Sequence, residues 1–76
     1  MHEKQLIELI LNYLRKNGSS TIYSALMNSL GPKEAAEFSK SLEYALERKG
    51  LIDLRGSEDG KKLADITTKG KMYLEE

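Results

Sequence analysis

The spacing of the apolar residues changes at Gly50, and this change constrains the fold more than any other feature of the sequence. Before Gly50, apolar residues recur every three or four positions, which is the spacing of helices that bury one face. After it, Ile52 and Leu54 alternate with charged residues, and a second alternating run follows at residues 62–66. A polar, glycine-bounded segment at residues 56–60 separates the two runs. Since alternation is typical of strands, the sequence predicts helices up to Gly50 and a two-stranded β-hairpin after it.

Two helices are expected in the first part of the chain. The spacing predicts the first over residues 3–16, ending at Gly18, because glycine accepts the left-handed backbone that often follows a last helical turn. Ser19 or Ser20 is expected to cap the second helix, which Gly31 stops.

A third helix is expected over residues 33–49. Pro32 suits the first turn of a helix, because its missing N–H has no intrahelical partner there. Gly50 ends the helix, and Leu51 is placed to fold back on its last turn. The expected core face of this helix consists of Ala35, Phe38, Leu42, Ala45 and Leu46.

A short final helix completes the expected fold. Thr67 or Thr68 can cap it, and it runs to Leu74. Internal repeats and linker-like segments are absent from the sequence. The sequence therefore predicts an α+β fold in a single domain over residues 1–76, with three helices, a two-stranded hairpin and a short C-terminal helix.

The composition excludes several kinds of chemistry. The sequence has no cysteine, so disulfides and thiolate zinc sites cannot form. His2 is the one histidine and lies at the terminus, which excludes Ser–His catalysis and histidine-based metal sites. We therefore expect no enzymatic activity, no cofactor and no metal. No apolar run approaches the roughly 20 residues that span a bilayer, and the first residues lack a signal-peptide pattern, so we expect a cytoplasmic protein.

Two stretches resemble those of a known family. The segment LERKGLI at residues 46–52 resembles the passage from recognition helix to wing in winged helix-turn-helix proteins. The segment ITTKGKMYL at residues 66–74 resembles the entry to their last helix. With both stretches at the usual separation, the chain is similar to small archaeal and MarR- or PadR-like transcriptional regulators. The resemblance implies a dimeric regulator that reads duplex DNA with its third helix and its wing.

The candidate DNA-contacting residues lie on the third helix, opposite its apolar side, and near the tip of the hairpin. Acidic neighbours oppose this assignment, because Glu37, Glu47, Glu58 and Asp59 repel phosphates. The alternative interpretation is a solvated helix face and a polar hairpin tip that only keep the protein soluble. The candidates are Lys33, Lys40, Ser41, Tyr44, Arg48, Arg55, Lys61 and Lys62.

The overall charge also bears on DNA binding. Twelve basic and twelve acidic residues cancel, so the chain lacks the positive charge of most nucleic-acid binders. Local lysines and arginines, however, determine the salt-sensitive part of the affinity. Hydroxyl and N–H groups at Ser20, Thr21 and Tyr23 can add phosphate contacts, or Ser20 serves only as a cap. One copy is expected to bind weakly, and a dimer doubles the contacts.

The first helix carries more apolar surface than one helix of a small domain usually needs. With about 100° between successive residues, its apolar positions cover an arc of roughly 200°. One interpretation is a homodimer interface, and the other is that the domain wraps this helix on two sides. The expected interface residues are Leu6, Ile7, Ile10, Leu11, Tyr13 and Leu14.

Two functions from different classes follow. The first is a homodimeric DNA-binding regulator whose partner is double-stranded DNA. The second is a winged-helix protein-interaction module that touches no nucleic acid and binds another protein through Ile7, Leu11 and Tyr13.

Overall fold

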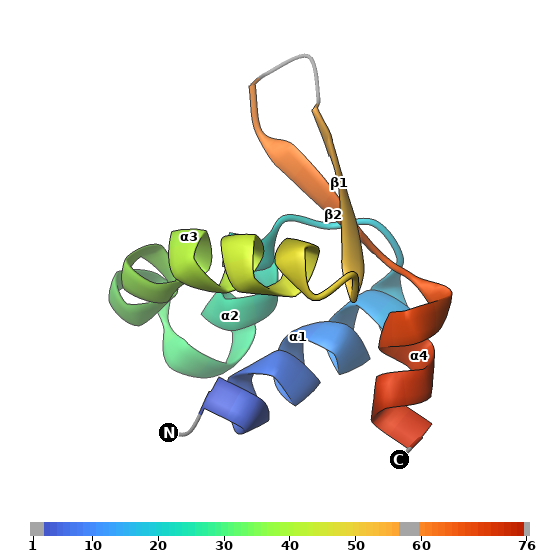
Figure 1. The fold of residues 1–76 in the computed structure, drawn as a ribbon. Helices are drawn as coiled ribbons and strands as arrows, with labels where there is room; N and C mark the ends of the chain where they lie inside the picture. Colours follow the sequence, from blue (N-terminus) through green and yellow to red (C-terminus); the bar gives the residue numbers. More distant parts are fainter. Residues whose placement is uncertain (1–2, 57–59, 76) are drawn as a thin grey trace.

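The structure, a computed structural model, describes residues 3–56 and 60–75, and these form four helices and two strands. The elements are α1 (Glu3–Asn17), α2 (Ile22–Leu30), α3 (Pro32–Arg48), β1 (Ile52–Gly56), β2 (Lys62–Ile66) and α4 (Thr68–Glu75) (Figure 1). The fold is α+β, as predicted, and the change of apolar spacing marks the change from helix to strand. Serine, glutamate and aspartate at positions 57–59, the predicted hairpin tip, lie outside the described residues.

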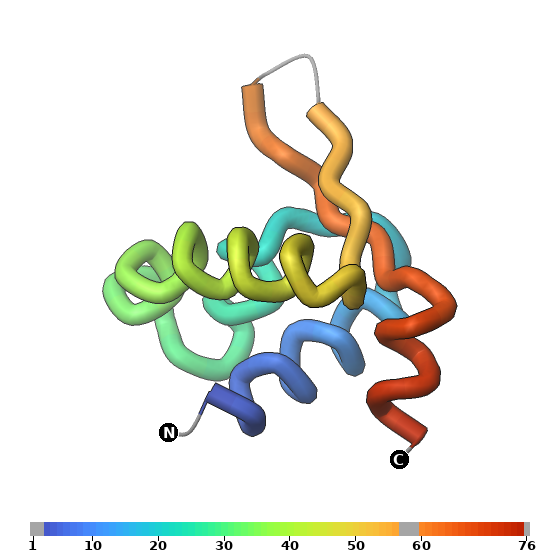
Figure 2. The backbone as a smooth tube through the Cα atoms, viewed as in Figure 1, coloured from blue at the N-terminus to red at the C-terminus, as the bar shows by residue number. Residues whose placement is uncertain are grey.

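The hairpin projects from a body made by the helices (Figures 1 and 2). α2 and α3 pack against each other, and α1 packs against α2 and also contacts β2. α4 returns beside α1 and also contacts β2. Within the described residues, no helix is both long enough and apolar enough to cross a membrane.

The two strands are antiparallel, and a third segment joins them at one residue. In the hairpin, Ile52 lies opposite Ile66 and Leu54 lies opposite Ala64. Ser20, in the connection between α1 and α2, forms a bridge to Ala64 on the outer edge of β2. The Ser20 N–H donates to the Ala64 carbonyl at 3.1 Å, and the Ala64 N–H donates to the Ser20 carbonyl at 2.7 Å. This bridge ties the middle of β2 to the connection between α1 and α2.

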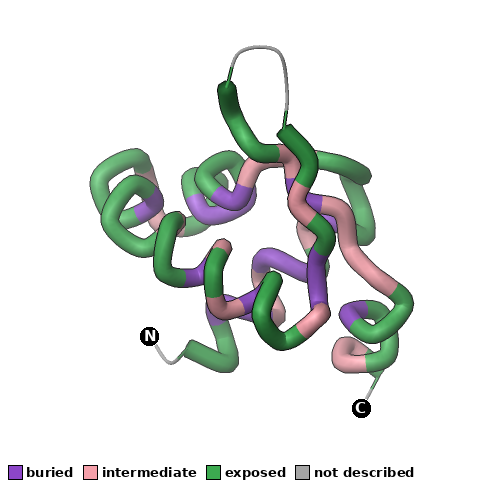
Figure 3. Tube along the Cα trace, turned by 45° about the horizontal axis from the view of Figure 1, so that its top comes forward, coloured by how far each residue is buried: buried purple, intermediate pink, exposed green. Residues whose placement is uncertain are grey.

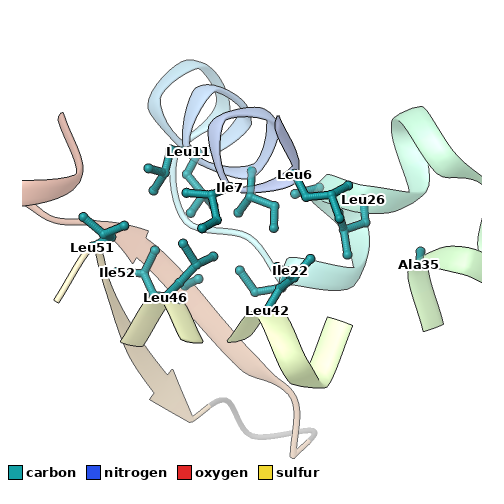
Figure 4. Packing of buried hydrophobic residues seen from close by; sticks show 14 residues of the cluster. Leu6, Ile7, Leu11, Ile22, Leu26, Ala35, Leu42, Leu46, Leu51 and Ile52 are labelled. Carbon is teal, nitrogen blue, oxygen red and sulfur yellow. The ribbon is translucent and has the colours of Figure 1, made fainter. Parts of the chain in front are cut away.

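Every element except α4 contributes buried apolar side chains to the core, and α1 contributes the largest share (Figure 4). Buried positions lie on the sides of the helices that face one another (Figure 3). Of the six residues expected at a dimer interface, five are buried inside this core: Leu6, Ile7, Ile10, Leu11 and Leu14. That interface prediction is therefore wrong for these five, because α2, α4 and the hairpin cover α1 from both sides. Tyr13 alone among the six is partly exposed.

The core face of α3 is narrower than predicted. Ala35, Leu42 and Leu46 are buried, but Phe38 is 37% exposed and Ala45 is only partly buried. These two side chains project from the flank of the helix, at the edge of the buried stripe. The inclusion of Phe38 in the core was therefore wrong.

Thr21, and neither of the two serines before it, caps α2. Its Oγ1 accepts from the Ser24 N–H at 3.1 Å, and its backbone is extended, as an N-cap requires. Ser20 cannot take this position because its backbone is paired with Ala64. The predicted helix ends are confirmed at Gly18 and Gly31, where φ is 83° and 86°.

Thr67 and Gly70 join α4 closely to the rest of the molecule. Thr67 Oγ1 accepts from the Gly70 N–H at 3.0 Å and donates to the Gly50 carbonyl at 2.7 Å. Of the two predicted capping residues, Thr67 is therefore the one that caps α4. A Cβ added at Gly70 would collide with the backbone oxygen of Leu51 and would lie 2.8 Å from Cγ1 of Ile66. A residue larger than glycine at position 70 would therefore prevent α4 from lying this close to Leu51 and Ile66.

Candidate nucleic-acid interface

The outward face of α3 presents the predicted residues to solvent. Lys33, Lys40, Ser41, Tyr44 and Arg48 are all exposed. Tyr44 is 64% exposed, and Arg48 Nη1 donates to its hydroxyl at 3.5 Å, one helical turn away. The helix thus carries an aromatic ring and a guanidinium side by side near its C-terminal end.

A groove lies between α3, the start of α2 and the start of β2. Lys40 of α3 and the hairpin residues Lys61 and Lys62 all line it, together with one carboxylate, that of Glu43. The structure therefore brings Lys40 together with Lys61 and Lys62, which are distant from it in the sequence. Among the described residues that line this groove, three are basic and one is acidic, so we call it the positive groove, although the chain as a whole is neutral.

The start of α2 adds polar groups to the same groove. Thr21 and Tyr23, both suggested as phosphate contacts, line it along with the hydroxyl-bearing Ser24 and Ser39. The first N–H groups of a helix have no intrahelical acceptor, so the N-terminal end of α2 adds partial positive charge. Ser20 does not line the groove, because its backbone is occupied by the bridge to β2.

Arg55 lies outside this groove, in a hydrogen-bonded cluster that joins β1 and β2. Its Nε forms an ion pair with Asp65 Oδ2 at 2.7 Å, and its Nη2 donates to Ser19 Oγ at 2.9 Å. The Ser19 hydroxyl in turn donates to the other carboxylate oxygen of Asp65. The charge of Arg55 is thus compensated within the fold, although 63% of its side chain is exposed. The cluster links both strands to the connection between α1 and α2.

Sequence reasoning missed Ser19 and Asp65 as partners of Arg55. In the observed register Arg55 lies opposite Leu63, and Asp65 is therefore its diagonal neighbour on the same face of the hairpin. That diagonal relation was the available signal, but it appears only once the register is known.

The other helix candidates, Lys33, Ser41, Tyr44 and Arg48, do not line the groove. Lys33 and Arg48 lie toward opposite ends of α3. From the helical spacing, Ser41 lies on the flank of α3 away from Ser39 and Glu43. Within the described residues, no three histidine, aspartate or glutamate side chains gather closely enough to hold a metal ion.

A second groove separates α1 from α2 and has a different character. Leu9, Tyr13 and Met27 supply its larger apolar side chains, and asparagine and serine residues supply most of the rest. Lys16 is the one charged residue among those that line it. Met27 is 47% exposed, so part of the surface of this groove is apolar.

Comparison with known proteins gave no match to a protein-family model, to a curated protein or to a solved structure.

Proposed function

We propose that the protein is a winged helix-turn-helix transcriptional regulator that binds duplex DNA with α3 and the hairpin. The order of the elements supports the winged-helix assignment, with a hairpin following the third helix. The bridge from Ser20 to Ala64 supports it further, because it anchors the hairpin to the segment that precedes α2. In this arrangement the outward face of α3 enters the major groove and the hairpin follows the backbone beside it.

The observation that carries the proposal is the positive groove. Lys40, Lys61 and Lys62 line it, and a phosphate backbone running between α3 and the hairpin meets all three. Each neutralised phosphate contributes about −0.9 to the slope of log K against log salt, so three contribute about −2.7. That slope predicts a loss of affinity of about 40-fold between about 50 mM and about 200 mM salt.

The experiment is fluorescence anisotropy with labelled duplex DNA over this salt range. The test variant replaces Lys40, Lys61 and Lys62 with alanine, and the control variant replaces Lys4, Lys69 and Lys71, which lie on α1 and α4. Both variants have the same net charge. We expect the groove variant to lose most of the salt dependence and the control to keep it. Absence of a salt-dependent complex for the parent at low salt would eliminate the proposed function, and equal losses in both variants would eliminate the groove as its site.

A homodimer is part of the proposal, because two copies double a small number of contacts. The buried residues of α1 cannot form its interface, so the groove lined by Leu9, Tyr13 and Met27 is the surface we assign to it. Sedimentation of the parent and of the Leu9→Glu variant tests this assignment. A parent that sediments as a monomer at high concentration contradicts it.

The alternative function is a protein-interaction module without nucleic-acid binding. The groove between α1 and α2 favours it, because Lys16 is the one charged residue among those that line it. Under this alternative the parent forms no salt-dependent complex with duplex DNA, so the anisotropy experiment also separates the two functions.

A further inference from the structure

Glu37 occupies the centre of the face that α3 turns to solvent. The helix buries Ala35, Leu42 and Leu46, and the helical spacing places Glu37 and Tyr44 almost directly opposite that stripe. Glu37 belongs to the N-terminal half of α3, which is the part of a recognition helix that contacts base edges. In the proposed binding mode this face of α3 meets the floor of the DNA groove, and Glu37 is the acidic side chain on it, between Lys33 and Tyr44.

The carboxylate of Glu37 is exposed, and no ion pair involving it is found within residues 3–56 and 60–75. Lysines stand nearby in the sequence, with Lys33 four positions before it and Lys40 three positions after it. A lysine four positions before a glutamate forms a weaker helical ion pair than the reverse order, and Lys33 and Glu37 have this less favourable order. Lys40 lines the positive groove. The fold therefore makes no evident use of this carboxylate.

A carboxylate in this position repels phosphates but fits one kind of base edge. In the major groove the N4 amino group of cytosine is a hydrogen-bond donor, and glutamate is a side chain that accepts from it. The guanine partner presents only acceptors there, which a carboxylate cannot use. In the proposed binding mode Lys40, which lines the positive groove, holds the backbone, and Glu37 is directed at the bases.

We propose that Glu37 is a specificity-determining residue that selects a cytosine in the target duplex. This inference rests on the proposed DNA-binding function. Glu37 favours cytosine at one position over the other bases by about fivefold or more, which corresponds to the lower end of the discrimination known for such base contacts. Because it contacts no phosphate, its replacement leaves the salt slope unchanged.

The test is selection of binding sites from a duplex library with one randomised segment, performed with the parent, Glu37→Gln and Glu34→Gln. Glutamine has the same shape as glutamate but pairs with the N6 and N7 of adenine. Glu34→Gln is the matched control, since it removes the same charge from the first turn of the same helix. We expect the parent and Glu34→Gln to enrich cytosine at one position and Glu37→Gln to enrich adenine there.

Anisotropy titrations on the selected duplexes complete the test. Glu37→Gln should lose the preference for cytosine, bind unselected DNA slightly more tightly and keep the parental salt slope. Identical base preferences in the parent and Glu37→Gln would overturn the inference and leave the DNA-binding function intact. Binding of the parent without any base preference would likewise overturn the inference and leave the DNA-binding function intact. A parent that forms no salt-dependent complex overturns the proposed function itself, which is a different result.

Discussion

Replacement of Gly70 by alanine tests how closely α4 is joined to the core. The added Cβ would collide with the backbone oxygen of Leu51 and would lie 2.8 Å from Cγ1 of Ile66. Leu51 cannot give way freely, because its carbonyl already accepts from the Thr67 N–H at 3.1 Å. Therefore α4 must shift, and the shift disturbs the hydrogen bond from the Gly70 N–H to Thr67 Oγ1.

The magnitude follows from three opposing contributions. Overpacking of a close contact costs about 1–3 kcal/mol, and weakening of an N-cap costs about 1 kcal/mol. Alanine recovers up to about 1 kcal/mol relative to glycine inside a helix. We therefore expect Gly70→Ala to lower the free energy of unfolding by about 1–3 kcal/mol. For a domain of this size, each kcal/mol lowers Tm by about 4–8 °C.

Urea unfolding followed by far-UV circular dichroism measures this loss, and Gly56→Ala is the matched control. A Cβ at Gly56 meets nothing within 4 Å, and its φ is not positive, so its replacement should change the stability by less than about 0.5 kcal/mol. Should Gly70→Ala prove as stable as the parent, the close approach of α4 to Leu51 would be refuted.

Three further predictions concern the same framework. Thr67→Ala should lower the free energy of unfolding by about 1–2 kcal/mol in urea titrations, since it removes both hydrogen bonds of the hydroxyl. Thr67→Ser keeps a hydroxyl and should retain most of the parental stability. Equal losses in the two variants would contradict the hydrogen-bonding role. Leu11→Ala should lower the free energy of unfolding by about 2–5 kcal/mol in the same measurement, because Leu11 is fully buried. Leu11→Glu should unfold the chain rather than separate a dimer. A folded, monomeric Leu11→Glu protein would contradict this expectation. Arg55→Ala should cost less than about 1 kcal/mol at low salt and less still at high salt, because the Arg55 side chain is 63% exposed in its ion pair with Asp65. A salt-independent loss would indicate a packing role instead.

Local signals were sufficient to predict most of the secondary structure. Pro32 and Gly31 lie where one helix ends and the next begins, and the alternation after Gly50 corresponds to the two strands. These predictions succeeded because a cap, a left-handed turn or a spacing involves only neighbouring residues. The cap of α2 was missed for the opposite reason: Ser20 is diverted by pairing with Ala64, which is distant in the sequence.

The candidate site shows the same division between local and distant information. Exposure of the α3 face could be predicted from helical spacing, and Lys40 proved to lie beside Lys61 and Lys62. The compensation of Arg55 by Asp65 depends on the hairpin register, which the sequence does not specify directly. The burial of α1 likewise depends on three elements packing around it, so a wide apolar arc alone could not distinguish a core helix from a dimer interface.

In the proposed role, the neutral net charge favours selectivity over raw affinity. Attraction to the phosphate backbone supplies nearly all binding to unselected DNA, and a chain with equal numbers of basic and acidic residues has little of it outside the positive groove. Since unselected sites vastly outnumber targets, the ratio of the two affinities determines which DNA is occupied. A carboxylate at Glu37 lowers affinity wherever it meets no donor, and so it increases that ratio. Removing the groove lysines should therefore weaken binding to all sequences alike, whereas changing Glu37 should alter which sequences are bound.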